Sequence, residues 1–219
     1  ILPESSVNFL QDVYGHVMDQ DKSSFVPWTD LMGEFVFKPE DSYFNIIVPT
    51  VETTRYNYIL KQLMCGGYNV LFSAETGVGK SVAIQQFLDQ QSNTNDYVSH
   101  TMGYSAQTKP SNIRDVLEEK LEKKRKTLLG PPAGKKMLFF IDDLNMPSLE
   151  TYGAQPPNEL LRQLIDQQGF YDVNKLFFKN VADVIFCGAC APPGGGRNEV
   201  SPRMLRQFSM VWLTSLSSN

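Results

Sequence analysis

The sequence has little of what metal clusters and disulfide scaffolds are made from. Its 219 residues include only 3 cysteines and 2 histidines, which excludes a disulfide scaffold and fits a reducing compartment. His16 and His100 have no partners at metal-ligand spacing. Cys187-Gly188-Ala189-Cys190 has the spacing of a redox C-x-x-C motif, but the Ala-Pro-Pro that follows cannot begin the helix that such a motif needs. We therefore expect both thiols to be buried strand residues.

Long apolar runs and an excess of basic residues are also missing. The longest apolar runs, 137–141 and 184–191, are far shorter than the roughly 20 residues of a membrane helix, so we expect no membrane partner. Lys and Arg total 20 against 24 for Asp and Glu, and the net charge of -4 disfavours nucleic acid as a partner. The first ten residues contain no Lys, Arg or Met. We expect no signal peptide and a piece of a longer protein.

What is present is an alternation of short apolar strands and amphipathic helices. This order is typical of βαβ units, so the predicted fold class is α/β, with a parallel sheet covered on both faces. We assign residues 48–219 to this domain and 1–47 to a preceding arm with β-like runs at 35–37 and 43–48. The predicted strands are 69–73, 97–102, 137–141, 184–190 and 208–213; the predicted helices begin at Thr50, include 85–88, run from Pro110 with a charged face through Lys126, and span 158–168.

A phosphate-binding loop follows the first strand of the domain. Residues 74–81 read Ala-Glu-Thr-Gly-Val-Gly-Lys-Ser between a strand and a helix, the context in which a Walker A match is credible. Phosphates need several converging backbone N–H donors, and glycines let the chain wrap that closely at a helix N-terminus. Lys80 offers a charge to the β- and γ-phosphates, and Ser81 offers a hydroxyl to Mg²⁺. Ala74 stands where glycine is usual, which fits if its φ is negative.

A Walker B pattern lies about 60 residues downstream of the phosphate-binding loop. The apolar strand 137–141 ends in Asp142-Asp143, so Asp142 is predicted to reach the Mg²⁺ shell and Asp143 to polarise the attacking water. Asp143 stands where vigorous ATPases usually have Glu, and its shorter side chain predicts impaired water activation. The Asn-Lys pair at Asn174 lacks the Asp of the guanine-specific Asn-Lys-x-Asp motif. We therefore expect ATP or ADP as the nucleotide.

At these positions the sequence resembles the AAA+ modules of dynein heavy chains, and in particular the third module of an axonemal dynein. The resemblance implies a P-loop NTPase core whose five strands are ordered 5-1-4-3-2, within a six-module ring that drives microtubule sliding. It also implies a regulatory nucleotide site, neighbouring modules and other dynein chains as partners, indirect contact with microtubules, and a place in the cytoplasm, on the cytoskeleton of the ciliary axoneme. The segments that carry it are 48–55, 75–81, 105–108, 140–147, 152–157, 159–163 and 191–198.

The same resemblance implies roles for individual residues. Arg206, rather than Arg203, would act as an arginine finger toward a neighbouring module's nucleotide. Asp143 would be catalytic, and Ser81 and Asp142 would bind Mg²⁺. The residues implied to contact the nucleotide are Ile47, Val48, Pro49 and Thr50 around the adenine, and Glu75, Thr76, Gly77, Val78, Gly79, Lys80, Ser81 and Val82 around the phosphates.

Three departures from the family pattern bear on activity. Ala74 and Asp143 are two of them, and Ala191 is the third, since it replaces the polar sensor residue, often Asn, at the end of the fourth strand. The sequence also ends soon after residue 213, so we expect the helical lid to be missing from this piece. Two alternatives to a slow regulatory site stay open: a structural ring segment without effective nucleotide exchange, and a self-sufficient ATPase, which would need a lid and an arginine in trans.

Overall fold

The structure is a computed structural model that describes residues 13–19, 22–33, 48–94 and 96–214. The chain divides into two units, residues 1–59 and 60–219. The predicted boundary between residues 47 and 48 stays a prediction, and helix α2 (Val51–Cys65) spans the division between the two units. Among the described residues, no helix combines the length and the apolar character needed to cross a membrane.

The first unit contains a small hairpin next to an aromatic cluster. Strands β1 (His16–Asp19) and β2 (Ser24–Pro27) pair antiparallel, between the short helices η1 (Val13–Gly15) and η2 (Trp28–Leu31). Trp28 is buried, packs edge-on against Tyr58, and donates its indole N–H to the Tyr14 carbonyl at 3.0 Å. The β-like run predicted at 35–37 lies outside the described residues, as does the run predicted at 43–48 except for its last residue, Val48.

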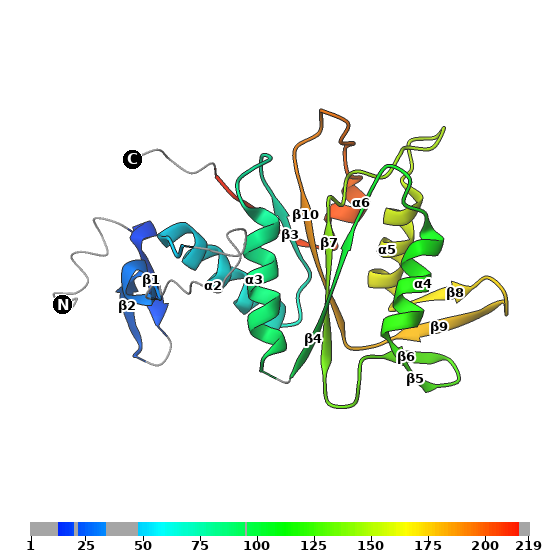
Figure 1. The fold of residues 1–219 in the computed structure, drawn as a ribbon, viewed down its shortest axis with the longest axis horizontal. Helices are drawn as coiled ribbons and strands as arrows, with labels where there is room; N and C mark the ends of the chain where they lie inside the picture. The colour runs from blue at the N-terminus through cyan, green and yellow to red at the C-terminus, as the bar shows by residue number, and fades with distance from the viewer. Residues whose placement is uncertain (1–12, 20–21, 34–47, 95, 215–219) are drawn as a thin grey trace, which may run out of the picture. The chain divides into compact units, whose positions relative to one another are not determined.

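The second unit is built on a parallel sheet of five strands (Figure 1). Across the sheet the strands follow the order β11-β3-β10-β7-β4. When these five strands are numbered 1 to 5 along the chain, the order is 5-1-4-3-2, as predicted. All four pairings are parallel. The strands are β3 (Val70–Ser73), β4 (Tyr97–Gly103), β7 (Lys136–Asp142), β10 (Val184–Cys190) and β11 (Ser209–Trp212).

Helices cover both faces of this sheet, with α3 on one side and α4 and α5 on the other (Figure 1). Alternate residues of β7 explain this arrangement, because side chains of a strand point to opposite faces. Met137, Phe139 and Ile141 join one buried cluster with Ile113 of α4 and Leu161 of α5. The helices are α3 (Lys80–Ser92), α4 (Pro110–Lys120), α5 (Pro156–Gln167) and α6 (Pro202–Leu205).

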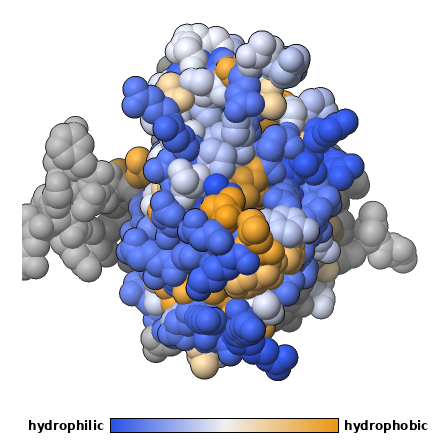
Figure 2. All heavy atoms as spheres, turned by 90° about the vertical axis from the view of Figure 1, so that its right-hand side faces the viewer, coloured by the Kyte–Doolittle hydropathy of each residue, from blue (hydrophilic) through white to orange (hydrophobic). Residues whose placement is uncertain are grey.

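A second sheet was not predicted from the sequence. Its order is β5-β6-β9-β8, from β5 (Glu122–Arg125), β6 (Leu128–Gly130), β8 (Gly169–Asp172) and β9 (Phe177–Val181). The predicted continuation of the charged helix face through Lys126 is therefore wrong beyond Lys120. The segment after the buried Leu121 pairs antiparallel with β6 instead, and all four side chains of β5 are exposed. Figure 2, which views the right-hand side of Figure 1, shows an apolar area among hydrophilic residues on this face.

Candidate functional site

The phosphate-binding loop connects β3 to α3 in the conformation that its glycines allow. Gly77 and Gly79 have φ values of 90° and 84°, in the left-handed region that side chains with a Cβ avoid. Ala74 does not share this conformation: it is fully buried, and its N–H donates to the Cys190 carbonyl at 3.2 Å. The glycine usual at this position is therefore not needed here, while the two later glycines are.

Lys80 is the first residue of α3 and folds back over the loop. Its Nζ donates to the carbonyls of Ala74 at 3.0 Å and Glu75 at 2.8 Å. These two bonds hold the ammonium against the loop, next to the N-terminus of a 13-residue helix. Unpaired backbone N–H groups and the helix dipole make such a terminus attractive to phosphate. Ser81 follows in the first turn and is partly exposed.

The two predicted acidic residues lie at the end of β7. Asp142 closes the strand, and its Oδ1 accepts the Asp143 N–H at 3.0 Å. Asp143 has a φ of 53°, in the left-handed region that Asp tolerates better than most residues. That backbone turn redirects the chain directly after Asp142, and the Asp143 carboxylate lies 3.7 Å from Nη2 of Arg197.

Three adjacent strands deliver these groups to one edge of the sheet. In the order β3-β10-β7, the phosphate-binding loop, Cys190 and the two acidic residues each follow or close a carboxyl end, where open α/β sheets bind ligands. The pKa of the Cys190 thiol is affected by charges from both the phosphate-binding loop and the acidic pair. Burial raises its pKa, a hydrogen bond to Ser73 and the charge of Lys80 oppose that rise, and the charge of Asp143 adds to it.

Both cysteines of the C-G-A-C segment are buried strand residues, as predicted. Cys187 is fully buried and Cys190 is 6% exposed, and burial raises the pKa of the Cys187 thiol as well. Thiols with raised pKa values are poor nucleophiles. No group of three or more His, Cys, Asp or Glu suited to a metal ion occurs among the described residues.

A cluster of buried amides lies behind the acidic residues, and sequence reasoning missed it. Asn145 is 1% exposed and donates from Nδ2 to the carbonyls of Ala191 at 2.7 Å and Asn198 at 3.2 Å. Gln155 donates to Pro147 at 2.7 Å, and Asn158 donates to Leu144 at 3.1 Å. The Asn145 bonds join the loop after β7 to the loop after β10, and the bonds of Gln155 and Asn158 join the same β7 loop to the start of α5. The available signal was that Asn145 and Gln155 lie inside segments that also carry the resemblance.

Several other predicted residues belong to other segments of the chain. Ile47 lies outside the described residues, while Val48 is exposed and Thr50 caps α2 in the first unit through reciprocal bonds with Thr53 of 2.8 and 3.2 Å. Arg206 follows α6, is 63% exposed, and lies 3.9 Å from Asp166 of α5. The roles predicted for these residues, for Val82 and for the loop residues stay predictions.

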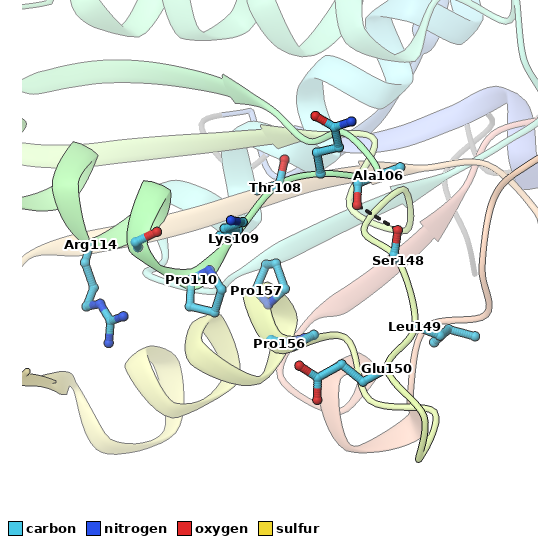
Figure 3. Close-up of a pocket in the computed structure, with 12 residues that line it drawn as sticks. Ala106, Thr108, Lys109, Pro110, Arg114, Ser148, Leu149, Glu150, Pro156 and Pro157 are labelled. Atoms are coloured by element: carbon cyan, nitrogen blue, oxygen red, sulfur yellow. Dashed lines mark hydrogen bonds between the residues drawn. The ribbon is translucent and has the colours of Figure 1, made fainter.

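The structure also contains a hollow that sequence reasoning did not predict. It measures about 720 Å³ and lies between the loop after β4, the N-termini of α4 and α5, and the segment after the acidic residues. Ser148 bridges two of these parts by donating from Oγ to the Ala106 carbonyl at 2.8 Å (Figure 3). Lys109 and Glu150 line it, but no residue of the phosphate-binding loop does. This hollow is therefore separate from the site described above.

Comparisons with known proteins bear directly on this geometry. A sequence model of the family described as "P-loop containing dynein motor region" matches residues 35–216. Dynein axonemal heavy chain 6 of Homo sapiens is 44% identical over 211 residues, and dynein axonemal heavy chain 1 of Mus musculus is 45% identical over 211 residues. Each alignment covers 96% of this chain but 5% of the relative's length. A solved structure of a putative ATPase from Cytophaga hutchinsonii aligns with a TM-score of 0.48 and 12% identity, over 76% of this chain and 47% of that one.

Proposed function

Because this chain belongs to the family of P-loop containing dynein motor regions, we propose that it is an AAA+ module of an axonemal dynein heavy chain that binds ATP or ADP with Mg²⁺. Within the ring it acts as a slow, regulatory nucleotide site, as the resemblance to a third module implies. The similarity to axonemal heavy chains supports a place on the cytoskeleton of the cilium or flagellum. Its partners are the neighbouring modules of the same heavy chain and, through the whole motor, other dynein chains and microtubules.

The observation that carries the nucleotide proposal is that the phosphate-binding loop and Asp142 lie at the same edge of the sheet, at the carboxyl ends of β3 and β7 on either side of β10. Gly77 and Gly79 have the left-handed φ values of a phosphate cradle, and Lys80 is held over that cradle. Ser81 and Asp142 would hold Mg²⁺, which neutralises phosphate charge when it is bound. The residues present therefore fit a magnesium nucleotide.

Slow turnover is supported by the groups that would act on the terminal phosphate. The side chain of Asp143 is one methylene group shorter than the usual Glu, and its carboxylate lies 3.7 Å from the guanidinium of Arg197. At the sensor position Ala191 contributes only its backbone, and its carbonyl is occupied by Asn145. Arg206 is exposed, which suits a finger directed at a neighbouring module's nucleotide but gives this chain none of its own. An arginine finger is worth about 10³–10⁵ in rate, so the isolated chain is expected to turn over poorly.

Calorimetric titration of ATP and of ADP, each with Mg²⁺, into the wild-type chain and its Lys80→Ala variant tests this proposal, with phosphate release followed in parallel. Hydrogen bonds to charged groups are worth about 1.5–3 kcal/mol, so Lys80→Ala is expected to weaken binding at least about tenfold. Lys126→Ala is the matched control, because Lys126 is exposed in the turn between β5 and β6. It should bind like the wild type.

The competing function is a structural ring segment without nucleotide exchange, which the pairing of Asp143 with Arg197 and the absence of a sensor amide at Ala191 favour. A folded wild-type chain that binds neither nucleotide would support this alternative and overturn the proposal. Binding that survives Lys80→Ala unchanged would place the nucleotide somewhere other than the phosphate-binding loop. Rapid phosphate release by the wild-type chain would contradict the regulatory reading and favour a self-sufficient ATPase.

A further inference from the structure

Arg197 lies beside the Walker B acidic pair although 54 positions separate it from Asp143 in the sequence. Its Nη2 is 3.7 Å from Oδ1 of Asp143. The arginine follows three glycines, Gly194, Gly195 and Gly196, with φ values of 128°, 57° and 88°. Three successive residues in that region require glycine, so the loop is shaped by its sequence to turn back just before Arg197.

Hydrogen bonds on both sides of Arg197 fix this loop. Gly194 and Arg197 exchange backbone N–H to carbonyl bonds of 3.0 Å each, which closes the turn. Directly after the arginine, Asn198 donates its backbone N–H to Asn145 at 3.0 Å and its Nδ2 to Pro147 at 2.9 Å. The guanidinium is therefore carried by a loop that is anchored to the segment following Asp143. Its place beside the acidic pair does not depend on the ion pair alone.

The guanidinium nevertheless keeps donors free. Its Nε is buried and has no hydrogen-bond partner. The 3.7 Å separation from Asp143 exceeds the roughly 2.7–2.9 Å of a charge-assisted hydrogen bond. A planar guanidinium with unused donors is suited to bidentate contact with an oxyanion such as phosphate.

The position of these donors identifies the part of the nucleotide that they suit. In the proposed function Asp142 would hold Mg²⁺ and Asp143 would adjoin the attacking water, so the terminal phosphate would be bound near both residues. Strand β10 lies between β3 and β7, so the phosphate-binding loop and the Asp143 partner of Arg197 leave the sheet on either side of the same end of β10. At that end the side chain of Ala191 has no polar group with which to contact a terminal phosphate.

We propose that Arg197 is a specificity-determining residue of this chain that contacts the terminal phosphate of ATP, with Asp143 as its partner when that phosphate is absent. The inference rests on the proposed function and adds that the site distinguishes ATP from ADP through an arginine of the same module. Arg206 remains the residue proposed for the neighbouring module's nucleotide.

The test compares the affinities of the chain for ATP and for ADP, each with Mg²⁺, by calorimetry, for the wild type, Arg197→Ala and Arg197→Lys. Arg197→Ala is expected to weaken ATP binding about tenfold or more, the effect of losing one charge-assisted contact, and to change ADP binding less than about twofold. Arg197→Lys keeps the charge without the fork and should restore part of the ATP affinity. Arg125→Ala, at the exposed strand β5, is the matched control and should leave both affinities unchanged.

A role confined to holding the loop predicts a different pattern. It would weaken ATP and ADP by equal factors and lower the thermal midpoint of the nucleotide-free chain, and that result overturns the inference. An unchanged affinity ratio in Arg197→Ala, together with binding that Lys80→Ala removes, overturns the inference while leaving the proposed function standing. If the wild-type chain binds neither nucleotide, both fall. If Arg197→Ala does not fold, the ratio measured for Arg197→Lys decides, because a changed fork geometry should still lower the ATP affinity selectively.

Discussion

Replacing Asn145 with alanine should destabilise the chain by about 2–4 kcal/mol. The side chain is 1% exposed and donates to two carbonyls, those of Ala191 at 2.7 Å and Asn198 at 3.2 Å. Each hydrogen bond has a net worth of about 1 kcal/mol, and a buried carbonyl left without a donor costs about 1–3 kcal/mol more. Asn145 Oδ1 accepts no hydrogen bond. The substitution therefore breaks only the two bonds that the side chain donates. The loop after β7 and the loop after β10 would lose the side-chain hydrogen bonds that Asn145 makes between them.

Urea unfolding of wild type and Asn145→Ala, with the midpoint and slope both fitted, measures this loss. Asn93→Ala is the control, because Asn93 is exposed at the end of α3 and should stay within about 0.5 kcal/mol of wild type. The double variant with Asn198→Ala adds a second test. Since the two asparagines bond to each other's loop, their effects should differ from additivity by more than about 0.5 kcal/mol. A loss below 0.5 kcal/mol in Asn145→Ala, or strict additivity, would refute the idea that this amide clasps the loops.

Three further substitutions test other parts of the second unit. Asp172→Asn removes a carboxylate whose pKa is lowered from 3.8 to about 2, chiefly by its hydrogen bond with Lys179 and then by the Lys175 N–H. A folded-state pKa below the unfolded value gives stability that is present above pH 4 and lost as the pH falls toward 2. The stability of the variant should therefore depend less on pH in that window, as measured by acid titrations followed by circular dichroism. An unchanged slope of stability against pH contradicts this. Gly169→Ala places a methyl group against the Lys179 carbonyl oxygen and should cost about 1–3 kcal/mol in urea unfolding, whereas Gly103→Ala meets nothing within 4 Å and should not; equal costs would argue against this close approach. Phe139→Ala empties a fully buried site in β7 and should cost about 3–5 kcal/mol with a lower thermal midpoint, and a loss under 1 kcal/mol would mean that the core collapses around it.

The main sheet could be predicted because its strands are apolar and the elements between them have helical periodicity. Strand β10 matches the prediction at 184–190, and β7 extends the predicted 137–141 by one residue at each end. The phosphate-binding loop could be recognised because it depends on local conformation, namely two glycines at positive φ before Lys80. Both features are properties of short, contiguous segments.

The second sheet could not be predicted because its strands depend on distant partners. Strand β5 consists of four charged residues and has no apolar face; it pairs with β6, which itself pairs in parallel with β9 about 50 residues later in the chain. Helix α4 ends at Lys120, just before this pairing begins, and no Gly or Pro at that point predicts the end of the helix. The contact between Arg197 and Asp143 escaped prediction for the same reason, since it joins loops that follow two different strands.

Gly188 shows how the core determines the spacing of the site. A Cβ at this position would lie 2.9 Å from Cδ1 of Leu71 and 3.5 Å from Cδ2 of Leu144. Leu71 lies three residues before the phosphate-binding loop, and Leu144 directly follows Asp143. A Cβ there would force the end of the Leu71 side chain to move and would touch Leu144 at an ordinary van der Waals distance, and a larger side chain would press on both residues. In the sequence Gly188 is only the second residue of a C-x-x-C pattern, yet its missing side chain leaves room for Leu71 and Leu144, which lie next to the two halves of the proposed nucleotide site.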